Sequence, residues 1–291
     1  MTLIKYKIFQ KVAECGSFTK ASLELNMTQS AVSHAISSLE KRMGFALFFR
    51  ENNKIEITKD GEKILNHVNL LLVSECKLLN KVNDINKLDE GLIRIGSFSS
   101  ASNRFVPPII RAILLEYPNI QIEIKEGSYR DIRLWLERGD IDVAFMVENY
   151  VNKKDFSIPF FKDEIVAVLP KKFKSIYKEN FDIKDFETLP VILPDNLCDK
   201  FVEDMFKVHD VTPNTVYKIR LNSTVFSMIE EDLGVSFAAE SNLYKHNYDF
   251  ISLPFKDRVF RQIYLVSNET EVMSQLVKKF YTIAKRFRAV D

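Results

Sequence analysis

The sequence predicts two architectures in one chain. A helical N-terminal region with a short β-hairpin and a long helix precedes an α/β region of two lobes. Up to residue 88 the apolar residues recur at helical spacing, except at residues 45–58, where strand alternation interrupts it. From residue 91 onward, apolar strand segments alternate with helices of about ten residues or more. With 291 residues and a hydrophobic content of 46%, the chain can bury more than one core.

The first two predicted helices are short. Residues 3–14 place apolar side chains on one helical face, and the run ends at Gly16. A second helix is expected over residues 18–25, with Ser17 or Thr19 as its N-cap. The residues that this helix is expected to bury are Phe18, Ala21, Leu23 and Leu25.

The third helix, residues 28–43, divides into an apolar and a polar face. Thr28 is its candidate N-cap and Gly44 its end. The apolar face consists of Ala31, Val32, Ala35, Ile36 and Leu39. The polar face carries Gln29, Ser30, Ser33, His34, Ser37 and Ser38. Gln and Ser side chains suit base edges and phosphates in a DNA groove, and the alternative is an ordinary solvated helix surface.

Context favours the nucleic-acid interpretation. A short helix, a turn and a longer helix are typical of a helix-turn-helix, whose second helix reads the major groove. Residues 45–50 and 55–58 predict a hairpin wing, with Arg50 and Lys54 placed for phosphates. Residues 1–63 carry ten Lys and Arg against seven Asp and Glu, a net charge of +3, whereas the remainder carries −2.

Residues 59–88 predict one long helix of about 40 Å. Its apolar stripe follows steps of three and four, interrupted at Glu75: Ile64, Val68, Leu71, Leu78, Val82 and Ile85. A stripe of this length without a neighbouring helix of similar length predicts pairing with the same helix of a second subunit. The alternative, a helix lying on its own domain, is less consistent with a following region that looks self-sufficient.

The α/β region alternates strands and helices. Strands are expected at residues 92–95, 120–125, 141–146, 165–169, 191–193, 217–221, 235–238 and 262–266. Helices are expected at residues 104–117, 129–138, 198–207, 224–233 and 272–288. This alternation predicts parallel sheets in two lobes, lobe I over 91–162 and 268–291 and lobe II over 163–267. Ligands of such folds bind at the carboxyl ends of strands, against helix N-termini.

The chain resembles the LysR-type transcriptional regulators. The matching segments and residues are 16–25, 28–33, Ile36, Leu39-Glu40, Gly44, Leu47-Phe48, Arg50, Thr58 and Gly61. Residues 141–145 and 233–235 are similar to recurring pieces of the family's effector domain. The resemblance implies a winged helix-turn-helix domain over 1–58, a linker helix over 59–88 and an effector-binding domain over 91–291 with a periplasmic-binding-protein-like fold.

For DNA, the resemblance implies a dimer or tetramer, joined through the linker helix, on an interrupted palindrome in double-stranded DNA. By position, Gln29, Ser33 and His34 would face the bases. The backbone would be held by Thr28, Ser37, Arg50, Lys54 and Thr58, and Ser17, Thr19 and Ser30 complete the expected DNA-binding set. Ser30 departs from the proline usual in the family, so the base preference near the helix start is expected to differ.

A serine-rich segment, residues 96–103, joins the first α/β strand to a helix. Its four serines and free backbone N–H groups predict an anion pocket, whereas capping by Ser102 or Asn103 explains only one or two of them. The resemblance implies a cleft lined by Ser99, Ser100, Ser128, Met146, Val147, Asn196, Cys198 and Thr224. We expect a small carboxylate or another anion as effector and no cofactor, although the sequence shows no obvious cleft Arg or Lys, and Met146 and Val147 would make an apolar wall.

Cys198 raises an alternative. It matches the position of the reactive cysteine in peroxide-sensing members of the family, and the start of a helix lowers the pKa of a thiol. Nine residues later, where those sensors carry a resolving cysteine, this chain has Lys207. A redox-sensing regulator is therefore the second hypothesis, behind a cysteine that only lines the cleft.

Other classes fit less well. The sequence has no phosphate loop, dinucleotide-binding glycine pattern, HExxH or GxSxG, and its four histidines lack ligand spacing, so an enzyme is not expected. Three separated cysteines form no disulfide or zinc pattern. No signal peptide or membrane span is evident, which predicts a cytoplasmic protein. A solute-binding protein would fit the C-terminal half alone, but not the N-terminal helix-turn-helix.

Overall fold

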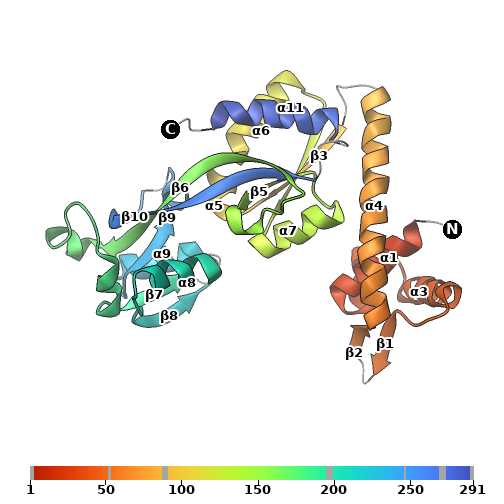
Figure 1. Ribbon diagram of the computed structural model, residues 1–291, viewed down its shortest axis with the longest axis horizontal. Coiled ribbons are helices and arrows are strands. Elements are labelled where there is room, and N and C mark those ends of the chain that lie inside the picture. The colour runs from red at the N-terminus through yellow and green to blue at the C-terminus, as the bar shows by residue number, and fades with distance from the viewer. Residues whose placement is uncertain are drawn as a thin grey trace. The chain divides into compact units, whose positions relative to one another are not determined.

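A computed structural model describes residues 3–51, 54–86, 91–194, 199–245, 247–268 and 273–288. They form two compact units, the first built mainly from the chain up to Asn86 and the second from the α/β region (Figure 1). No helix within these described ranges is both long and apolar enough to cross a membrane.

The N-terminal unit confirms the three helices, the wing and the long helix. Its elements are α1 (Ile4–Cys15), α2 (Phe18–Glu24), α3 (Gln29–Met43), β1 (Phe48–Glu51), β2 (Lys54–Ile57) and α4 (Lys59–Asn86). The core joins all three short helices to the wing and to the first half of α4. One burial prediction was wrong: Leu23 is 74% exposed, and Ser22 lies inside instead, with its hydroxyl donating to the carbonyl of Thr19 at 2.8 Å.

The apolar stripe of α4 divides into two halves. Ile64, Val68 and Leu72 pack against the core of the N-terminal unit. Farther along, Leu78 is 63% exposed and Val82 is 43% exposed. The first half of α4 therefore lies on its own domain, as the alternative interpretation held, and the second half presents apolar side chains to solvent in the single chain.

Polar contacts also fix α1 to α4. The side-chain amide of Gln10 donates to Asn69 Oδ1 at 3.0 Å. One turn earlier on α1, Lys7 forms an ion pair with Glu75 at 2.9 Å. Together with the shared apolar core, these contacts join the helix-turn-helix to the part of α4 that ends at Glu75.

The C-terminal unit holds one six-stranded sheet and one two-stranded sheet. The large sheet has the order β4-β3-β5-β10-β6-β9, and the small sheet pairs β7 with β8. The strands are β3 (Gly91–Ser97), β4 (Ile120–Glu126), β5 (Val143–Val147), β6 (Phe156–Pro170), β7 (Val191–Pro194), β8 (Thr215–Ile219), β9 (Ser236–Ala239) and β10 (Phe250–Ser267). The α-helices are α5 (Ser99–Arg104), α6 (Val106–Glu116), α7 (Tyr129–Arg138), α8 (Asp199–Val208), α9 (Asn222–Glu230), α10 (Glu240–Leu243) and α11 (Gln275–Ala284).

The expectation of purely parallel sheets was wrong. β3 pairs in parallel with β4 and β5, but β10 runs antiparallel to β5 and β6, and β6 runs antiparallel to β9. β6 and β10 are 15 and 18 residues long, and only one end of each was expected as a strand. Charged residues such as Lys162 and Arg258 interrupt their apolar pattern, which hid the remaining length.

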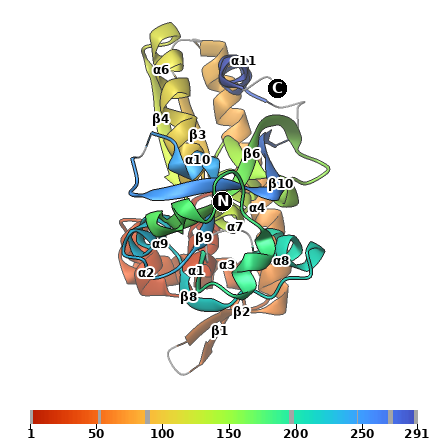
Figure 2. The same cartoon turned by 90° about the vertical axis from the view of Figure 1, so that its left-hand side faces the viewer.

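Two lobes share the long β6–β10 pair. Lobe I packs α6 and α11 on one face of the sheet and α7 on the other (Figures 1 and 2). Lobe II buries α8 on one side of its strands and α9 on the other. Ile263 and Leu265 pack in the core of lobe I, so β10 returns to that lobe earlier than the expected boundary after residue 267.

The helix expected over 104–117 corresponds to α6, and a short helix that was not expected, α5, precedes it. α5 ends at Arg104, and α6 starts directly after Phe105 with prolines in its first turn. Proline lacks an amide hydrogen and fits the first turn of a helix, but it breaks a helix interior, so Pro107 and Pro108 separate the two helices.

Candidate nucleic-acid interface and ligand pocket

The polar face of α3 lies on the surface of the N-terminal unit. Val32, Ala35, Ile36 and Leu39 are buried beneath it. Thr28 caps the helix, since its hydroxyl accepts from the amide of Ala31 at 3.2 Å, and Gly44 ends it at φ +82°. The predicted groove-facing residues are exposed (Gln29, Ser30, His34, Ser37) or half-buried (Ser33). Ser38 differs, because its hydroxyl accepts from the Lys5 ammonium at 2.6 Å.

The wing is attached to α3 through Glu40. The carboxylate of Glu40 accepts from the amides of Leu47 and Phe48 at 2.8 and 3.3 Å. Gly61 allows the start of α4 to approach the same loop, because a Cβ at this position would meet the Leu47 carbonyl oxygen at 2.5 Å. The orientation of the wing relative to α3 is therefore fixed by named contacts.

The structure corrects the role expected for Thr58. This residue is only 7% exposed. Its hydroxyl donates to the Ala46 carbonyl and accepts from the Gly61 amide, both at 2.9 Å. Both hydrogen-bonding functions are thus used to cap α4 and hold the loop before the wing, so Thr58 is a scaffold residue and not a phosphate contact.

Replacing Thr58 with Val is expected to lower the free energy of unfolding of the N-terminal unit by about 1–2 kcal/mol, because a cap and a buried hydrogen bond are lost. Urea unfolding followed by far-ultraviolet circular dichroism measures the change. Thr58→Ser keeps the hydroxyl and is the matched control. Equal destabilisation by both variants would contradict the capping role.

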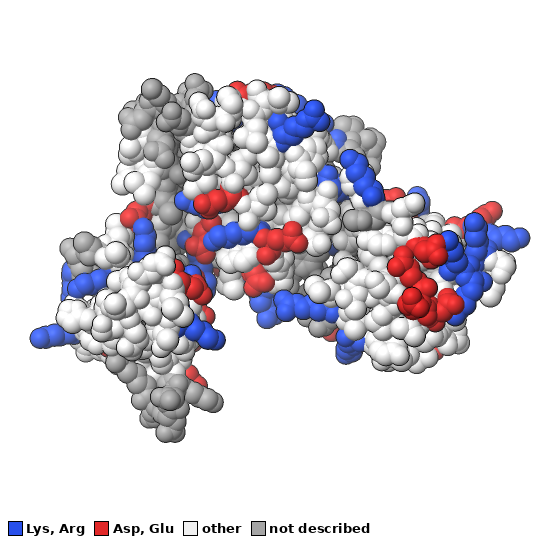
Figure 3. All heavy atoms as spheres, turned by 180° about the vertical axis from the view of Figure 1, so that it is seen from behind, with Lys and Arg blue, Asp and Glu red and all other residues white. Residues whose placement is uncertain are grey.

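The remaining expected DNA contacts fall into two groups. Ser17 caps α2 by accepting from the Lys20 amide at 3.3 Å, and Thr19 is exposed beside it. Arg50 and Lys54 lie in the paired strands of the wing, and their side chains are outside what the structure describes. Figure 3 shows the N-terminal unit as a largely uncharged surface with separate basic side chains around it.

Lys11 is a basic residue of the N-terminal unit whose charge is paired within the unit. Burial opposes its charge, but hydrogen bonds and the charges of Glu14 and Glu24 raise the pKa of Lys11 to about 12. Its ammonium lies 2.8 Å from Glu14 and 3.1 Å from Glu24. The cation is therefore neutralised within the unit.

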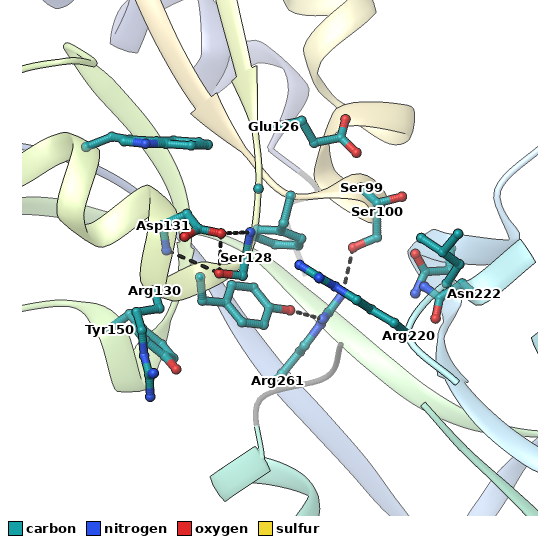
Figure 4. Close-up of a pocket in the computed structure, with 16 residues that line it drawn as sticks. Ser99, Ser100, Glu126, Ser128, Arg130, Asp131, Tyr150, Arg220, Asn222 and Arg261 are labelled. Atoms are coloured by element: carbon teal, nitrogen blue, oxygen red, sulfur yellow. Dashed lines mark hydrogen bonds between the residues drawn. The ribbon is translucent and has the colours of Figure 1, made fainter. Parts of the chain in front are cut away.

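The C-terminal unit contains a cavity of about 670 Å³. Its lining residues come from both lobes and from β10: Phe98, Ser99, Ser100, Glu126, Gly127, Ser128, Tyr129, Arg130, Asp131, Trp135, Tyr150, Arg220, Leu221, Asn222, Asn242 and Arg261. In Figure 4, Arg220 and Asn222 enter from the lobe II side, while Ser99, Ser100 and Ser128 come from lobe I. The structure thus brings together three of the predicted serines.

Other predicted pocket residues lie elsewhere. Met146 and Val147 are buried in the core of lobe I, because β5 is an interior strand covered on both faces, so the expected apolar wall is not formed by them. Thr224 is exposed on α9 and is not among the lining residues. Asn196 and Cys198 lie outside the described residues.

Three arginines line the cavity, which the sequence did not reveal. Arg130 and Arg220 are exposed at its wall, and Arg261 is 6% exposed in the middle of β10. An arginine within the strand-forming run 259–266 was the available signal for Arg261. The basic side chains that were not obvious from the sequence are therefore present in the cavity wall.

Arg261 is held by hydrogen bonds from several elements. Its Nε and Nη2 donate to Asp163 Oδ2 at 2.9 and 2.6 Å. Its Nη1 donates to the Tyr129 hydroxyl at 2.6 Å, and its Nη2 donates to the Ser100 hydroxyl at 2.8 Å (Figure 4). A buried arginine with a carboxylate partner and neutral acceptors is a preorganised donor group.

The lobe I wall is fixed by local contacts. Asp131 Oδ2 accepts from the amide and the hydroxyl of Ser128 at 3.0 and 2.6 Å, which caps α7. The Tyr129 ring stands 4.8 Å from Phe98 and 5.7 Å from Tyr150, between ring centroids. Aromatic rings and guanidinium groups suit a small anion with an apolar body. Among the described residues, no group of three or more His, Cys, Asp and Glu could hold a metal ion.

Two family models match the chain. Residues 3–62 match the bacterial regulatory helix-turn-helix protein, lysR family, and residues 86–288 match the LysR substrate binding domain. The second match alone covers more than half of the chain.

Individual proteins agree over the full length. The uncharacterized HTH-type transcriptional regulator YvbU of Bacillus subtilis is 31% identical, over 98% of each chain. The HTH-type transcriptional regulator AlsR of the same species is 26% identical, over 98% of this chain and 95% of that protein. Among solved structures, CbnR, a LysR family transcriptional regulator, has a TM-score of 0.69 at 16% identity over 100% of both chains. Full-length OxyR C199D from Pseudomonas aeruginosa has a TM-score of 0.68 at 18% identity, over 99% of this chain and 96% of that chain.

Proposed function

The chain belongs to the LysR family of transcriptional regulators, and from this premise we propose that it binds an interrupted palindrome in double-stranded DNA as a dimer or tetramer and responds to a small anionic effector. The observation that carries the DNA proposal is the capped α3 with its exposed row of neutral hydrogen-bonding side chains. The similar protein CbnR has been solved with its target DNA, at 17% identity and a TM-score of 0.67 over 98% of this chain and 99% of that chain.

On α3, Gln29, Ser33 and His34 would reach base edges, and Ser37 with Thr28 would approach the backbone. Neutral side chains of this kind give modest discrimination, so the phosphate contacts of the wing and of exposed residues such as Lys20 would supply much of the affinity. A regulator that acts on DNA would act in the cytoplasm, without a catalytic step of its own.

The DNA proposal is tested by fluorescence anisotropy with labelled duplexes from the region upstream of the chain's own gene. With about 6–10 phosphate contacts, affinity is expected to fall about 10³–10⁵-fold between roughly 50 and 200 mM salt. A scrambled duplex of equal length is the control. A DNA affinity that does not change with salt concentration, or no preference over the scrambled duplex, would overturn the proposal.

The oligomer proposal rests on α4. The exposed side chains of Leu71, Leu78 and Val82 fall at steps of seven and four residues, which is one face of a helix. None of these three side chains belongs to the apolar core of the described N-terminal unit. Pairing of two α4 helices would bury this face and bring two copies of α3 onto one DNA duplex.

The effector proposal rests on the cavity. Arg220 points into it from lobe II, and Ser99, Ser128 and Arg130 line it from lobe I (Figure 4). Guanidinium and hydroxyl groups together favour a carboxylate or a similar oxyanion. The relatives are named as HTH-type transcriptional regulators, which favours neither a redox role for Cys198 nor a solute-binding role.

Replacing Arg220 with Ala is expected to weaken anion binding about tenfold or more, because a charge-assisted hydrogen bond is removed. The chain's one tryptophan, Trp135, lines the cavity, so its fluorescence reports titration with acetate, benzoate or sulfate. Lys218→Ala, two residues earlier on β8 and outside the lining, is the matched control. Equal losses in both variants, or a Trp135 signal that none of the three anions changes, would argue against the effector site.

A further inference from the structure

One guanidinium in the C-terminal unit contacts residues of both lobes. Arg261 and four partners form a cluster that we call the Arg261 cluster: Ser100, Tyr129, Asp163, Ser241 and Arg261. All five are buried. Ser100 and Tyr129 belong to lobe I, Ser241 belongs to α10 after β9 of lobe II, and the remaining two lie on the long strands that the lobes share.

One side of the cluster is part of the shared strands. Arg261 and Asp163 are direct partners in the register of the β6–β10 pair. Ser241 closes this side, since its amide and hydroxyl donate to Asp163 at 3.1 and 2.6 Å. Both side chains of the ion pair are buried, and the position of the guanidinium is set by backbone pairing as well as by charge.

The other side of the cluster holds the starts of two helices. Ser100 lies in the first turn of α5, and Tyr129 is the first residue of α7. Each follows a serine that lines the cavity, Ser99 and Ser128. The hydroxyls of Ser100 and Tyr129 therefore link the starts of α5 and α7 to Arg261 of the shared strands by side-chain hydrogen bonds.

We propose that Arg261 is a positioning residue that ties α5 and α7 of lobe I to the shared strands, so that its two lobe I bonds hold the cavity in its closed form. The hydrogen bonds that join Arg261, Asp163 and Ser241 are permanent. The hydrogen bonds from Arg261 to Ser100 and Tyr129 break when the cavity opens and form when it closes. The proposal deepens the proposed effector site and rests on it: an effector touching Ser99 or Ser128 acts on residues next to the two acceptors.

Hydrogen–deuterium exchange of the full chain tests the tie without DNA or effector. In the double variant Ser100→Ala/Tyr129→Phe, the amides of residues 98–104 and 128–138 are expected to exchange about tenfold faster or more. This factor corresponds to the loss of a charge-assisted hydrogen bond. The amides of α6 and α11 should exchange as in the unchanged chain. Faster exchange across all of lobe I would show a merely structural role, and unchanged exchange would refute the tie.

Two further variants complete the test. Tyr281→Phe removes another buried tyrosine hydroxyl, which is hydrogen-bonded to Ser267 at 3.3 Å. Neither residue lines the cavity, so amide exchange in residues 98–104 and 128–138 should stay unchanged. Arg261→Lys keeps a cation for Asp163 but loses the planar fork that reaches both lobe I acceptors, so it should loosen the same two segments. If Arg261→Lys exchanges like the unchanged chain, the tie is wrong. Because no ligand enters this test, a failure to find any binding anion leaves its result standing.

Discussion

Replacing Asp163 with Asn is expected to lower the free energy of unfolding of the C-terminal unit by about 3–5 kcal/mol. The change keeps the size of the side chain but removes the counter-charge of Arg261, which is buried and donates to Asp163 through two nitrogens. An uncompensated guanidinium in a low-dielectric site is costly, and Ser100 and Tyr129 are neutral acceptors that cannot replace the charge.

Urea unfolding followed by Trp135 fluorescence measures this effect, because the single tryptophan lies in the C-terminal unit. Asp249→Asn is the control: its ion pair with Lys171 is exposed on both sides, and its loss is expected to cost under about 1 kcal/mol. If the two substitutions lowered the free energy of unfolding by similar amounts, the buried pair would stabilise the unit no more than an exposed pair does.

Replacing Leu78 with Glu on α4 is expected to dissociate the oligomer and to weaken DNA binding about 100-fold or more. The exposed leucine would lie at the centre of the paired α4 helices, and a carboxylate buried there would lack a partner. A monomer carries one copy of α3, so it loses the gain of binding two half-sites at once. Sedimentation velocity and fluorescence anisotropy give the two readouts.

Ile176→Glu is the matched control for this prediction. Ile176 is 67% exposed in lobe II, so the same change adds a charge to an exposed apolar position outside the α4 sequence. It should leave both the oligomer and the DNA affinity unchanged. A Leu78→Glu protein that still sediments as an oligomer would show that α4 is not the principal interface.

The local patterns of the N-terminal unit were sufficient to predict its helices and hairpin, because their signals do not depend on distant partners. Apolar spacing located α3, and Thr28 and Gly44 marked its two ends. Thr58 shows the limit of this reasoning. The family resemblance implied a DNA-backbone contact for Thr58, and only the folded loop showed that its hydrogen bonds go to Ala46 and Gly61.

The C-terminal unit was harder because its decisive contacts are distant in the sequence. Asp163 and Arg261 lie 98 positions apart and meet only through the register of β6 and β10. Each strand contains charged residues that look like loop when read alone, since the pairing partner that buries them is not visible locally. Ser99 and Ser100 were found because they lie in one segment between a strand and a helix, and Ser128 was implied by the resemblance, whereas Arg261 and Arg220 approach from other parts of the fold.

The contacts between α1 and α4 have a geometric consequence. Gln10 with Asn69 and Lys7 with Glu75 join the helix-turn-helix to the part of α4 that ends at Glu75, while the exposed Leu78 and Val82 lie on the part after it. Each residue added between these two parts would rotate one relative to the other by about 100°. The number of residues in α4 therefore sets the angular phase at which α3 meets successive turns of the double helix.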